Sequence, residues 1–465
     1  MQTWSVPGLS VVVVQGEGVQ TFAYGALEVG GDAPVDEHTR FPVASLTKAF
    51  TATSVALLVD SGELAWDDKV VDRLPGFQLY DPYVTANVTV EDLLSHRTGL
   101  DGWAADHLWQ GSPYERAEIL RRVRYQPAGG RFRDHFGYSN VMYIAAGELV
   151  AAVTGSSWDA FVAERLLGPL GMQDSTTSFA ELSAQGNVIT PHIVVDGELV
   201  RMPLYDTDNV GPAAGLSTSA HDLGRWLQLQ LADGELQGQR VVSQASLRAT
   251  RSPHAALPAQ SGKGPMATAP HPFYGMGWFG YDYQGQVVLQ HGGMIDGARA
   301  MVVMVPDAHV GVAVLTNEVL GQAQEAIAYD LLDQLLGVSP QDWVAQLAPK
   351  PGAEPEEPPR ARRTRPSLEL QGYAGTYSDA LSGDAEVRLE DGHLVFAYNA
   401  KYTADLEHWH HDTFSASWRD PWAATWAGTF VSFELDEAGE PALLRTAFDY
   451  PVSFQAEPEA REVEP

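Results

Sequence analysis

The order of strand and helix patterns along residues 1–340 constrains the fold more than any other feature of the sequence. Runs rich in β-branched residues lie at 9–14 and 19–24, and similar runs return at 287–316. In between, from about 45 to 178, apolar residues recur at spacings of three and four, which is the period of a helix. Strands from both ends must share one sheet to bury their apolar sides. We therefore predict an α+β domain whose antiparallel sheet is flanked by helices, with a helical subdomain inserted between its strands.

A second, smaller domain follows a proline-rich stretch. Residues 341–367 contain six prolines, an acidic part and a basic part, and this composition favours an extended linker. Beyond it, apolar and polar residues alternate on both sides of the turn signal Asp391-Gly392. Short alternating strands joined by turns predict a small antiparallel β-barrel over residues 368–465.

Charge and residue usage disfavour or exclude several function classes. The chain has 29 basic and 60 acidic residues, a net charge of −31, and so repels phosphate backbones and anionic membranes. We therefore expect no nucleic-acid partner. Since the chain has no cysteine, disulfides, thiolate nucleophiles and cysteine-type zinc sites are excluded. No apolar run approaches the ~18–20 residues that a membrane span needs.

The first pattern that carries chemistry is Ser45-Leu46-Thr47-Lys48, at the start of a helical segment. Side chains three residues apart lie on one face of a helix, one turn from each other. Burial and the positive end of the helix dipole both disfavour a lysine ammonium. A neutral amine there can take the serine proton, which makes the hydroxyl a usable nucleophile. A serine cap followed by a surface lysine gives the same pattern.

The second pattern is Tyr138-Ser139-Asn140, in a loop before another helical segment. In an extended loop, the first and third side chains point the same way. A phenol near an ammonium can ionise below its reference pKa of ~10 and serve as base and acid. The amide can bond both Lys48 and a substrate carbonyl. A core tyrosine beside a helix cap is the structural alternative.

The third pattern is His291-Gly292-Gly293, at the end of a strand-like run. Glycines allow a substrate backbone to approach the edge of a sheet closely. The N–H of Met294 could join that of Ser45 in an oxyanion hole. A strand-to-turn corner with a structural histidine also fits these residues.

The order of the three patterns resembles that of the penicillin-recognising serine hydrolases. The similar branch includes class C β-lactamases, D-Ala-D-Ala carboxypeptidases, D-aminopeptidases and family esterases. Further similar stretches are 6–9, 93–100, 169–172, 214–219 and 274–278. The resemblance covers roughly residues 4–337. Residues 373–377, Tyr-Ala-Gly-Thr-Tyr, resemble the opening of a lipocalin-like barrel that some members carry.

The resemblance implies a site without a metal or organic cofactor, acting on a small molecule or short peptide. Ser45 would attack a carbonyl, while Lys48 and Tyr138 would share the work of the general base. Which of the two takes the first proton stays open, because coupled groups titrate as a pair. The residues implied for substrate binding and the oxyanion are Asn140, His291, Gly293 and Met294.

The sequence departs from the family at two places. His291 stands where relatives carry a lysine that grips a substrate carboxylate, and an imidazole of reference pKa ~6.5 is largely neutral at pH 7. This disfavours typical β-lactamase or carboxypeptidase activity, and we expect acidification toward pH 6 to charge His291. The helix usually found ahead of Val6 is missing, and there is no signal-peptide pattern. A cytoplasmic location is the default expectation; a periplasmic or secreted one is the alternative if Met1 is an internal start.

The function that we favour is that of a peptidase or amidase, and several other functions compete with it. Ester hydrolysis or weak β-lactamase activity would use the same site, and a catalytically silent peptidoglycan- or ligand-binding module would use the same fold. The barrel could restrict access or mediate self-association. His408 and His410 could bind a metal, although a histidine-rich polar face is favoured. His96 could lie near the site, but we favour a structural role at a helix end.

Overall fold

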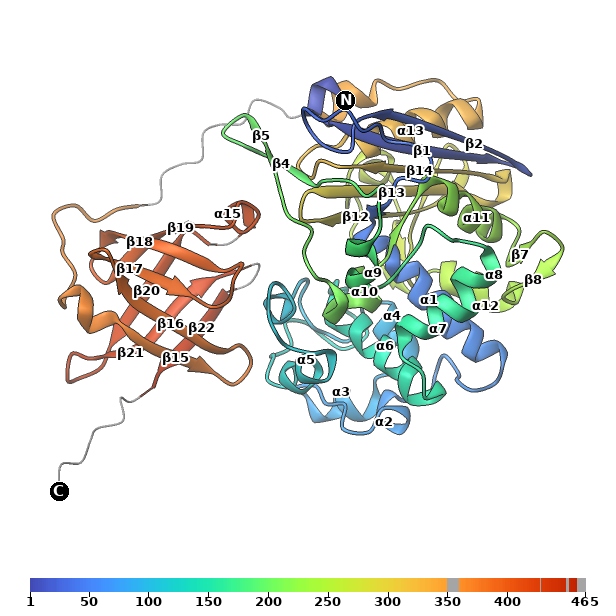
Figure 1. Cartoon of the computed structure of the whole chain (residues 1–465). Helices are drawn as coiled ribbons and strands as arrows, with labels where there is room; N and C mark the ends of the chain where they lie inside the picture. Colours follow the sequence, from blue (N-terminus) through green and yellow to red (C-terminus); the bar gives the residue numbers. More distant parts are fainter. Residues whose placement is uncertain (349–358, 427, 449–450, 458–465) are drawn as a thin grey trace. The chain divides into compact units, whose positions relative to one another are not determined.

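The computed structural model describes residues 1–348, 359–426, 428–448 and 451–457 (Figure 1). Contacts divide the chain into two compact units. The first unit contains Met1–Gly102 and the stretch from Ala128 to the end of the first domain. The second unit joins Trp103–Pro127 to the C-terminal part of the chain. Residues 349–358 of the predicted linker lie outside the described residues.

An eight-stranded antiparallel sheet forms the centre of the first unit. Its strand order is β2-β1-β14-β13-β12-β11-β10-β9. The strands are β1 (Gly8–Gln15), β2 (Gly18–Gly25), β9 (Ala255–Ala256), β10 (Phe273–Tyr274), β11 (Phe279–Tyr283), β12 (Gln286–Ile295), β13 (Ala298–Val305) and β14 (Val310–Thr316). In register, Val12 lies opposite Ala313. The N-terminal hairpin therefore completes a sheet begun by the late strands, which confirms the predicted α+β fold.

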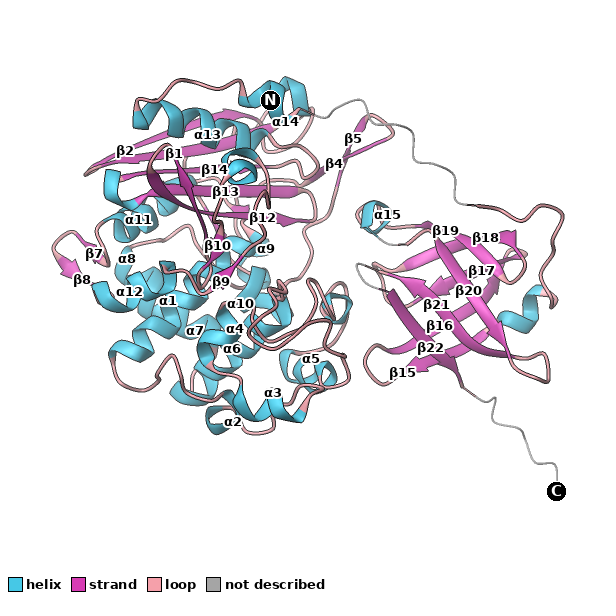
Figure 2. Cartoon of the chain, turned by 180° about the vertical axis from the view of Figure 1, so that it is seen from behind, coloured by secondary structure: helices cyan, strands magenta, loops and turns pink. Residues whose placement is uncertain are grey.

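Helices cover both faces of this sheet (Figures 1 and 2). Helix α13 (Ala323–Leu336) packs on the face that carries Val11 and Val312. Helix α11 (Ala220–Leu231) packs on the other face, where Gly224 lies close enough for an added Cβ to stand 3.2 Å from the side chain of Val12. Val11 and Val12 point to opposite faces, as the strand period of two requires. Each such buried valine contributes ~1.5–3 kcal/mol of stability.

The helical subdomain positions the residues predicted to be functional. Its members in the first unit are α1 (Thr47–Asp60), α2 (Val70–Arg73), α3 (Pro82–Asn87), α4 (Val90–Leu94), α6 (Asn140–Thr154), α7 (Trp158–Val162), α8 (Gly168–Leu170), α9 (Phe179–Ala184), α10 (Gly211–Ala214) and α12 (Gln244–Arg251). Residues 47–58 of α1 are all buried, so this helix lies in the interior. Helix α6 begins at a serine cap, Ser139, and ends at Gly155, whose φ of 72° is the left-handed conformation that favours glycine.

The second unit contains a closed barrel, which confirms the predicted C-terminal fold. Its strands, joined in sequence order, are β15 (Gly375–Asp379), β16 (Gly383–Glu390), β17 (His393–Ala397), β18 (Thr403–His410), β19 (Thr413–Trp418), β20 (Phe430–Leu435), β21 (Pro441–Ala447) and β22 (Pro451–Ala456). Phe396, Phe414 and Phe454 are among the residues that fill its core.

The segment Trp103–Pro127 packs against this barrel within the second unit. It contains α5 (Arg116–Val123). The side chain of His107 lies 3.0 Å from the hydroxyl of Ser382, and Asn399 donates a hydrogen bond of 2.9 Å to the carbonyl of Gln110. Among the described residues, no helix is both long enough and apolar enough to cross a membrane.

Candidate active site

Ser45 lies in a 3-10 turn, η2 (Ala44–Leu46), immediately before the buried helix α1. Ala44 has a φ of 46°, a left-handed conformation that costs an L-residue ~1–2 kcal/mol. The short strand β3 (Phe41–Pro42) pairs with β6 (Ser217–Thr218), and this pairing fixes the chain as it enters the turn. The strained turn thus presents Ser45 at a defined position beside the end of the sheet.

Lys48 brings the first two sequence patterns together. Its Nζ lies 3.1 Å from Ser45 Oγ, 2.6 Å from Asn140 Oδ1 and 3.1 Å from the carbonyl oxygen of Ala213. The side chain is fully buried, and these three partners are uncharged. A buried amine needs such partners because an unpaired one carries a large desolvation cost.

Tyr138 completes the cluster around the amine. Lys48 Nζ lies 4.7 Å from the centre of the Tyr138 ring, whose negative face attracts a cation. Ser139 accepts a hydrogen bond from the N–H of Met142 and so caps α6. Tyr138 and Asn140, on either side of this cap, both reach Lys48. The structure therefore brings Ser45, Lys48, Tyr138 and Asn140 together.

Strand β12 passes directly beside the Ser45 turn. A Cβ added to Gly293 would stand 2.0 Å from the carbonyl oxygen of Val43 and 3.3 Å from Ser45 N, so only glycine allows this approach. Within the described residues, β11 pairs with β12 only as far as Gln290, whereas β13 pairs as far as Ile295. The last five residues of β12, which include Met294, therefore pair with a neighbouring strand on one side only.

His291 is placed differently from what the sequence predicts. It is 2% exposed, and its Nε2 lies 3.2 Å from the Tyr274 hydroxyl. Burial, aided by the charge of Lys48, lowers the pKa of His291 to about 3. The expectation that acidification to pH 6 would charge this imidazole is therefore wrong. The His291 ring therefore lies against Tyr274, below the surface of the candidate site.

His96 follows the end of α4 directly after Ser95, and its ring also lies beside the candidate site. Its ring lies 4.5 Å from that of Tyr138 and 4.8 Å from that of Tyr274. Its Nδ1 accepts a hydrogen bond of 3.1 Å from the N–H of Ser139, so a neutral ring carries its proton on Nε2. Burial lowers its pKa well below the usual value. A lone histidine offers no spacing signal from which this position could be found.

Comparisons with known proteins find relatives of both parts of the chain. The Beta-lactamase family model matches residues 1–336, and the model named Domain of unknown function (DUF3471) matches residues 359–462. Penicillin-binding protein 4 of Amycolatopsis lactamdurans is 32% identical over 80% of this chain and 93% of its own length. Unguisins hydrolase ungD of Aspergillus violaceofuscus is 29% identical over 95% of this chain and 85% of its own.

A solved structure shares the fold over nearly the whole chain. The octameric penicillin-binding protein homologue from Pyrococcus abyssi superposes with a TM-score of 0.65 at 22% identity, covering 98% of this chain and 97% of that one. At this identity the likeness concerns the fold alone. The family model, by contrast, spans most of the chain and includes all three motifs. The chain belongs to the Beta-lactamase family.

Proposed function

We propose that this family member is a serine hydrolase that cleaves amide bonds of peptides through an acyl-enzyme. The observation that carries the proposal is the buried Lys48 amine, 3.1 Å from Ser45 Oγ and held by Asn140. A serine hydroxyl is a weak nucleophile until a nearby base accepts its proton. No other role accounts as directly for a lysine buried between a serine, an amide and a tyrosine ring.

The reaction follows from the positions of these groups. Ser45 Oγ attacks the carbonyl carbon while its proton passes to the coupled pair of Lys48 and Tyr138. The N–H groups of Ser45 and Met294 stabilise the oxyanion. Tyr138 then gives a proton to the leaving amine as the C–N bond breaks. A water molecule, deprotonated by the same pair, attacks the ester and releases the acid and Ser45.

The surroundings of Ser45 favour an extended peptide as the substrate. The free edge of β12 offers backbone groups to a second extended chain. A small pocket of about 20 Å³ adjoins the site; its lining includes Pro42, Phe179, Leu182, Ser217, Ile295 and Asp296.

An ester or a lactam could react at the same nucleophile, so the substrate class needs a direct test. We would compare a D-amino-acid anilide, an L-amino-acid anilide, a carboxyl ester and a chromogenic lactam, each with the wild type and with Ser45→Ala. We expect anilide hydrolysis in the wild type and a loss of at least about a thousandfold in the variant. Turnover of the ester alone would assign an esterase. Turnover of the lactam alone would assign a β-lactamase, and no turnover would favour the binding module.

A further inference from the structure

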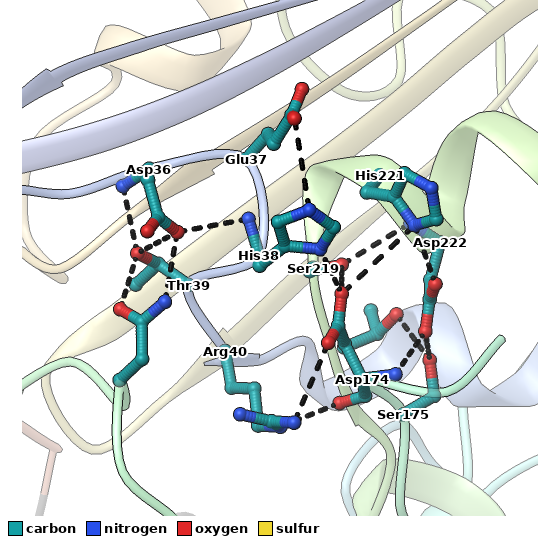
Figure 3. A network of polar contacts seen from close by, with 12 residues as sticks. Asp36, Glu37, His38, Thr39, Arg40, Asp174, Ser175, Ser219, His221 and Asp222 are labelled. Atoms are coloured by element: carbon teal, nitrogen blue, oxygen red, sulfur yellow. Dashed lines mark hydrogen bonds and ion pairs between the residues drawn. The ribbon is translucent and has the colours of Figure 1, made fainter.

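Three side chains from distant parts of the first unit converge on its surface (Figure 3). His38 precedes β3, Asp174 follows α8, and His221 lies in the first turn of α11. One ligand atom from each lies within 4.8 Å of the others. Asp174 Oδ2 is 2.8 Å from His38 Nδ1 and 4.0 Å from His221 Nδ1.

The carboxylate of Asp174 is held from several sides. Ser219 Oγ donates a hydrogen bond of 2.9 Å to Asp174 Oδ2, and Arg40 lies 3.4 Å from the other oxygen, Oδ1. The backbone N–H of Asp174 donates a hydrogen bond of 2.8 Å to Asp222. Asp174 is only 15% exposed, whereas His38 is 50% exposed. A fixed carboxylate with two half-exposed imidazoles beside it is pre-organised to receive a ligand from solvent.

Charge around the cluster favours a cation. Besides Asp174, the carboxylate of Asp222 lies 3.0 Å from His221 Nδ1, and that of Glu37 lies 3.6 Å from His38 Nε2. These three acidic groups outnumber the single guanidinium of Arg40, which is bound to the side of Asp174 away from the imidazoles. A dication would relieve the repulsion among the carboxylates.

We propose that His38, Asp174 and His221 bind a zinc ion through His38 Nδ1, Asp174 Oδ2 and His221 Nδ1, with water as the fourth ligand. Two imidazoles and one carboxylate match the ligand preference of Zn²⁺. Ligand atoms around a tetrahedral zinc lie about 3.3 Å apart, and the separations of 2.8 and 4.0 Å lie on either side of this value. Zinc binding through His38 Nδ1 requires that nitrogen to be free of its proton.

Such an ion would join three segments that support the Ser45 turn. His38 lies three residues before β3, and His221 follows the strand β6 that pairs with β3. The zinc ion would therefore stabilise the paired strands from the end opposite the turn. Since it binds the folded chain only, saturation with zinc should raise the melting temperature.

The test compares the full-length wild type with His221→Gln, His38→Gln and a matched control, His271→Gln, which alters an exposed histidine outside the cluster. Each chain is stripped with a chelator, dialysed against micromolar ZnCl₂, and assayed for bound zinc and melting temperature. Circular dichroism without zinc checks folding. Zinc bound by residues 408–411, which are rich in histidine, is the same in all these chains. A difference in zinc content between variants therefore reports on the cluster alone.

We expect the wild type and His271→Gln to bind one zinc ion more than either cluster variant. At zinc a hundredfold above Kd, their melting temperature should rise by about 4 °C, and this rise should vanish in both cluster variants. Equal zinc content in the wild type and His221→Gln would overturn the proposal. A melting temperature that zinc leaves unchanged in the wild type would overturn it equally. Hydrolysis by Ser45 is not needed for either readout.

Discussion

At the scale of single residues, the surroundings of Lys48 decide what Ser45 can do. The amine is withdrawn from water and bonded to neutral oxygens. Such a site keeps the nitrogen aimed at Ser45 Oγ, and it makes the lysine depend on each of its partners. The hydrogen bond from Lys48 Nζ to Asn140 Oδ1 is the shortest of these contacts, at 2.6 Å.

Replacing Asn140 with alanine should therefore impair both activity and stability. We expect kcat to fall at least tenfold, because Lys48 loses its orientation. The free energy of unfolding should fall by about 1–3 kcal/mol, because the buried Lys48 amine loses one of its hydrogen-bond acceptors. Steady-state kinetics and urea unfolding measure the two effects. The matched control is Asn87→Ala, which removes an exposed lysine–asparagine bond of 3.4 Å to Lys69; equal effects in both variants would contradict the account.

His291 gives a prediction about pH. Its pKa is about 3 in the folded chain and ~6.5 when unfolded. Below pH 6.5 the unfolded chain binds a proton that the folded chain does not. The stability that this neutral histidine provides is therefore complete above pH 6.5. It is lost at about 1.4 kcal/mol per pH unit as the pH falls toward 3.

Urea unfolding at pH 7.5, 6 and 5 should show this dependence in the wild type. In His291→Asn the slope between pH 6 and 5 should be smaller by about 1.4 kcal/mol per pH unit. Identical slopes would mean that the imidazole takes up its proton in the folded state. The same low pKa predicts that the ratio of kcat/KM for matched acid and amide substrates stays constant from pH 8 to pH 6.

At the scale of elements, the segment Trp103–Pro127 has an unusual position. It is covalently inserted into the first unit, between Gly102 and Ala128, and yet packs with the barrel. Arg122 of α5 donates a hydrogen bond of 3.3 Å to the carbonyl of Leu381. Removal of the barrel therefore uncovers one side of this segment.

A chain that ends at Ala348 keeps the core residue Trp343 and should keep a folded sheet, but it should lose protection of this segment. We expect trypsin to cleave within α5, after its arginines, at least tenfold faster than in the full-length chain, because the barrel contacts no longer hold the helix. Timed digestion followed by mass spectrometry measures the rates. Equal cleavage rates would show that the barrel contacts do not protect the segment. An unfolded truncated chain would contradict independent folding of the first domain.

The sequence predicts elements well where the signal is local. Helix α6 begins where the sequence predicts a helical segment, directly after Ser139, because this serine caps it, and it ends at Gly155. The left-handed turn at Ala44 was not predicted, because tertiary contacts with β12 impose it. The packing of Trp103–Pro127 on a barrel more than 250 residues later leaves no trace in the local pattern. The ring contacts of His96 come from three separate segments, so local spacing does not predict them.

In the candidate site, too, local sequence predicts some contacts and not others. The spacing of Ser45 and Lys48 places both on one turn, so their contact follows from helix geometry alone. That Tyr138 and Gly293 approach Ser45 could be predicted only from the family resemblance, because neither residue lies near Ser45 in the sequence. The burial of His291 depends on the packing of Tyr274 against it and could not be read from composition. Domain boundaries at 340 and 367 stay predictions.

At the scale of the whole molecule, the net charge of −31 should govern how charged substrates arrive. Long-range repulsion slows anions and attraction speeds cations, and salt screens both beyond ~10 Å at 0.1 M. We expect kcat/KM for a cationic peptide to exceed that of its anionic counterpart. The ratio should shrink at least about threefold between 20 and 300 mM NaCl. A ratio independent of salt would mean that the charge lies too far from the site to act.

The central claim, that Ser45 is the nucleophile of an acyl-enzyme, is tested most directly by mass spectrometry of the intact chain after exposure to a fluorophosphonate probe. The wild type should gain the mass of one probe, located on the peptide that contains Ser45. Ser61→Ala, which alters an exposed serine at the end of α1, should gain the same mass, and Ser45→Ala should gain none. Labelling that persists in folded Ser45→Ala, or that lies on another residue, would contradict the account.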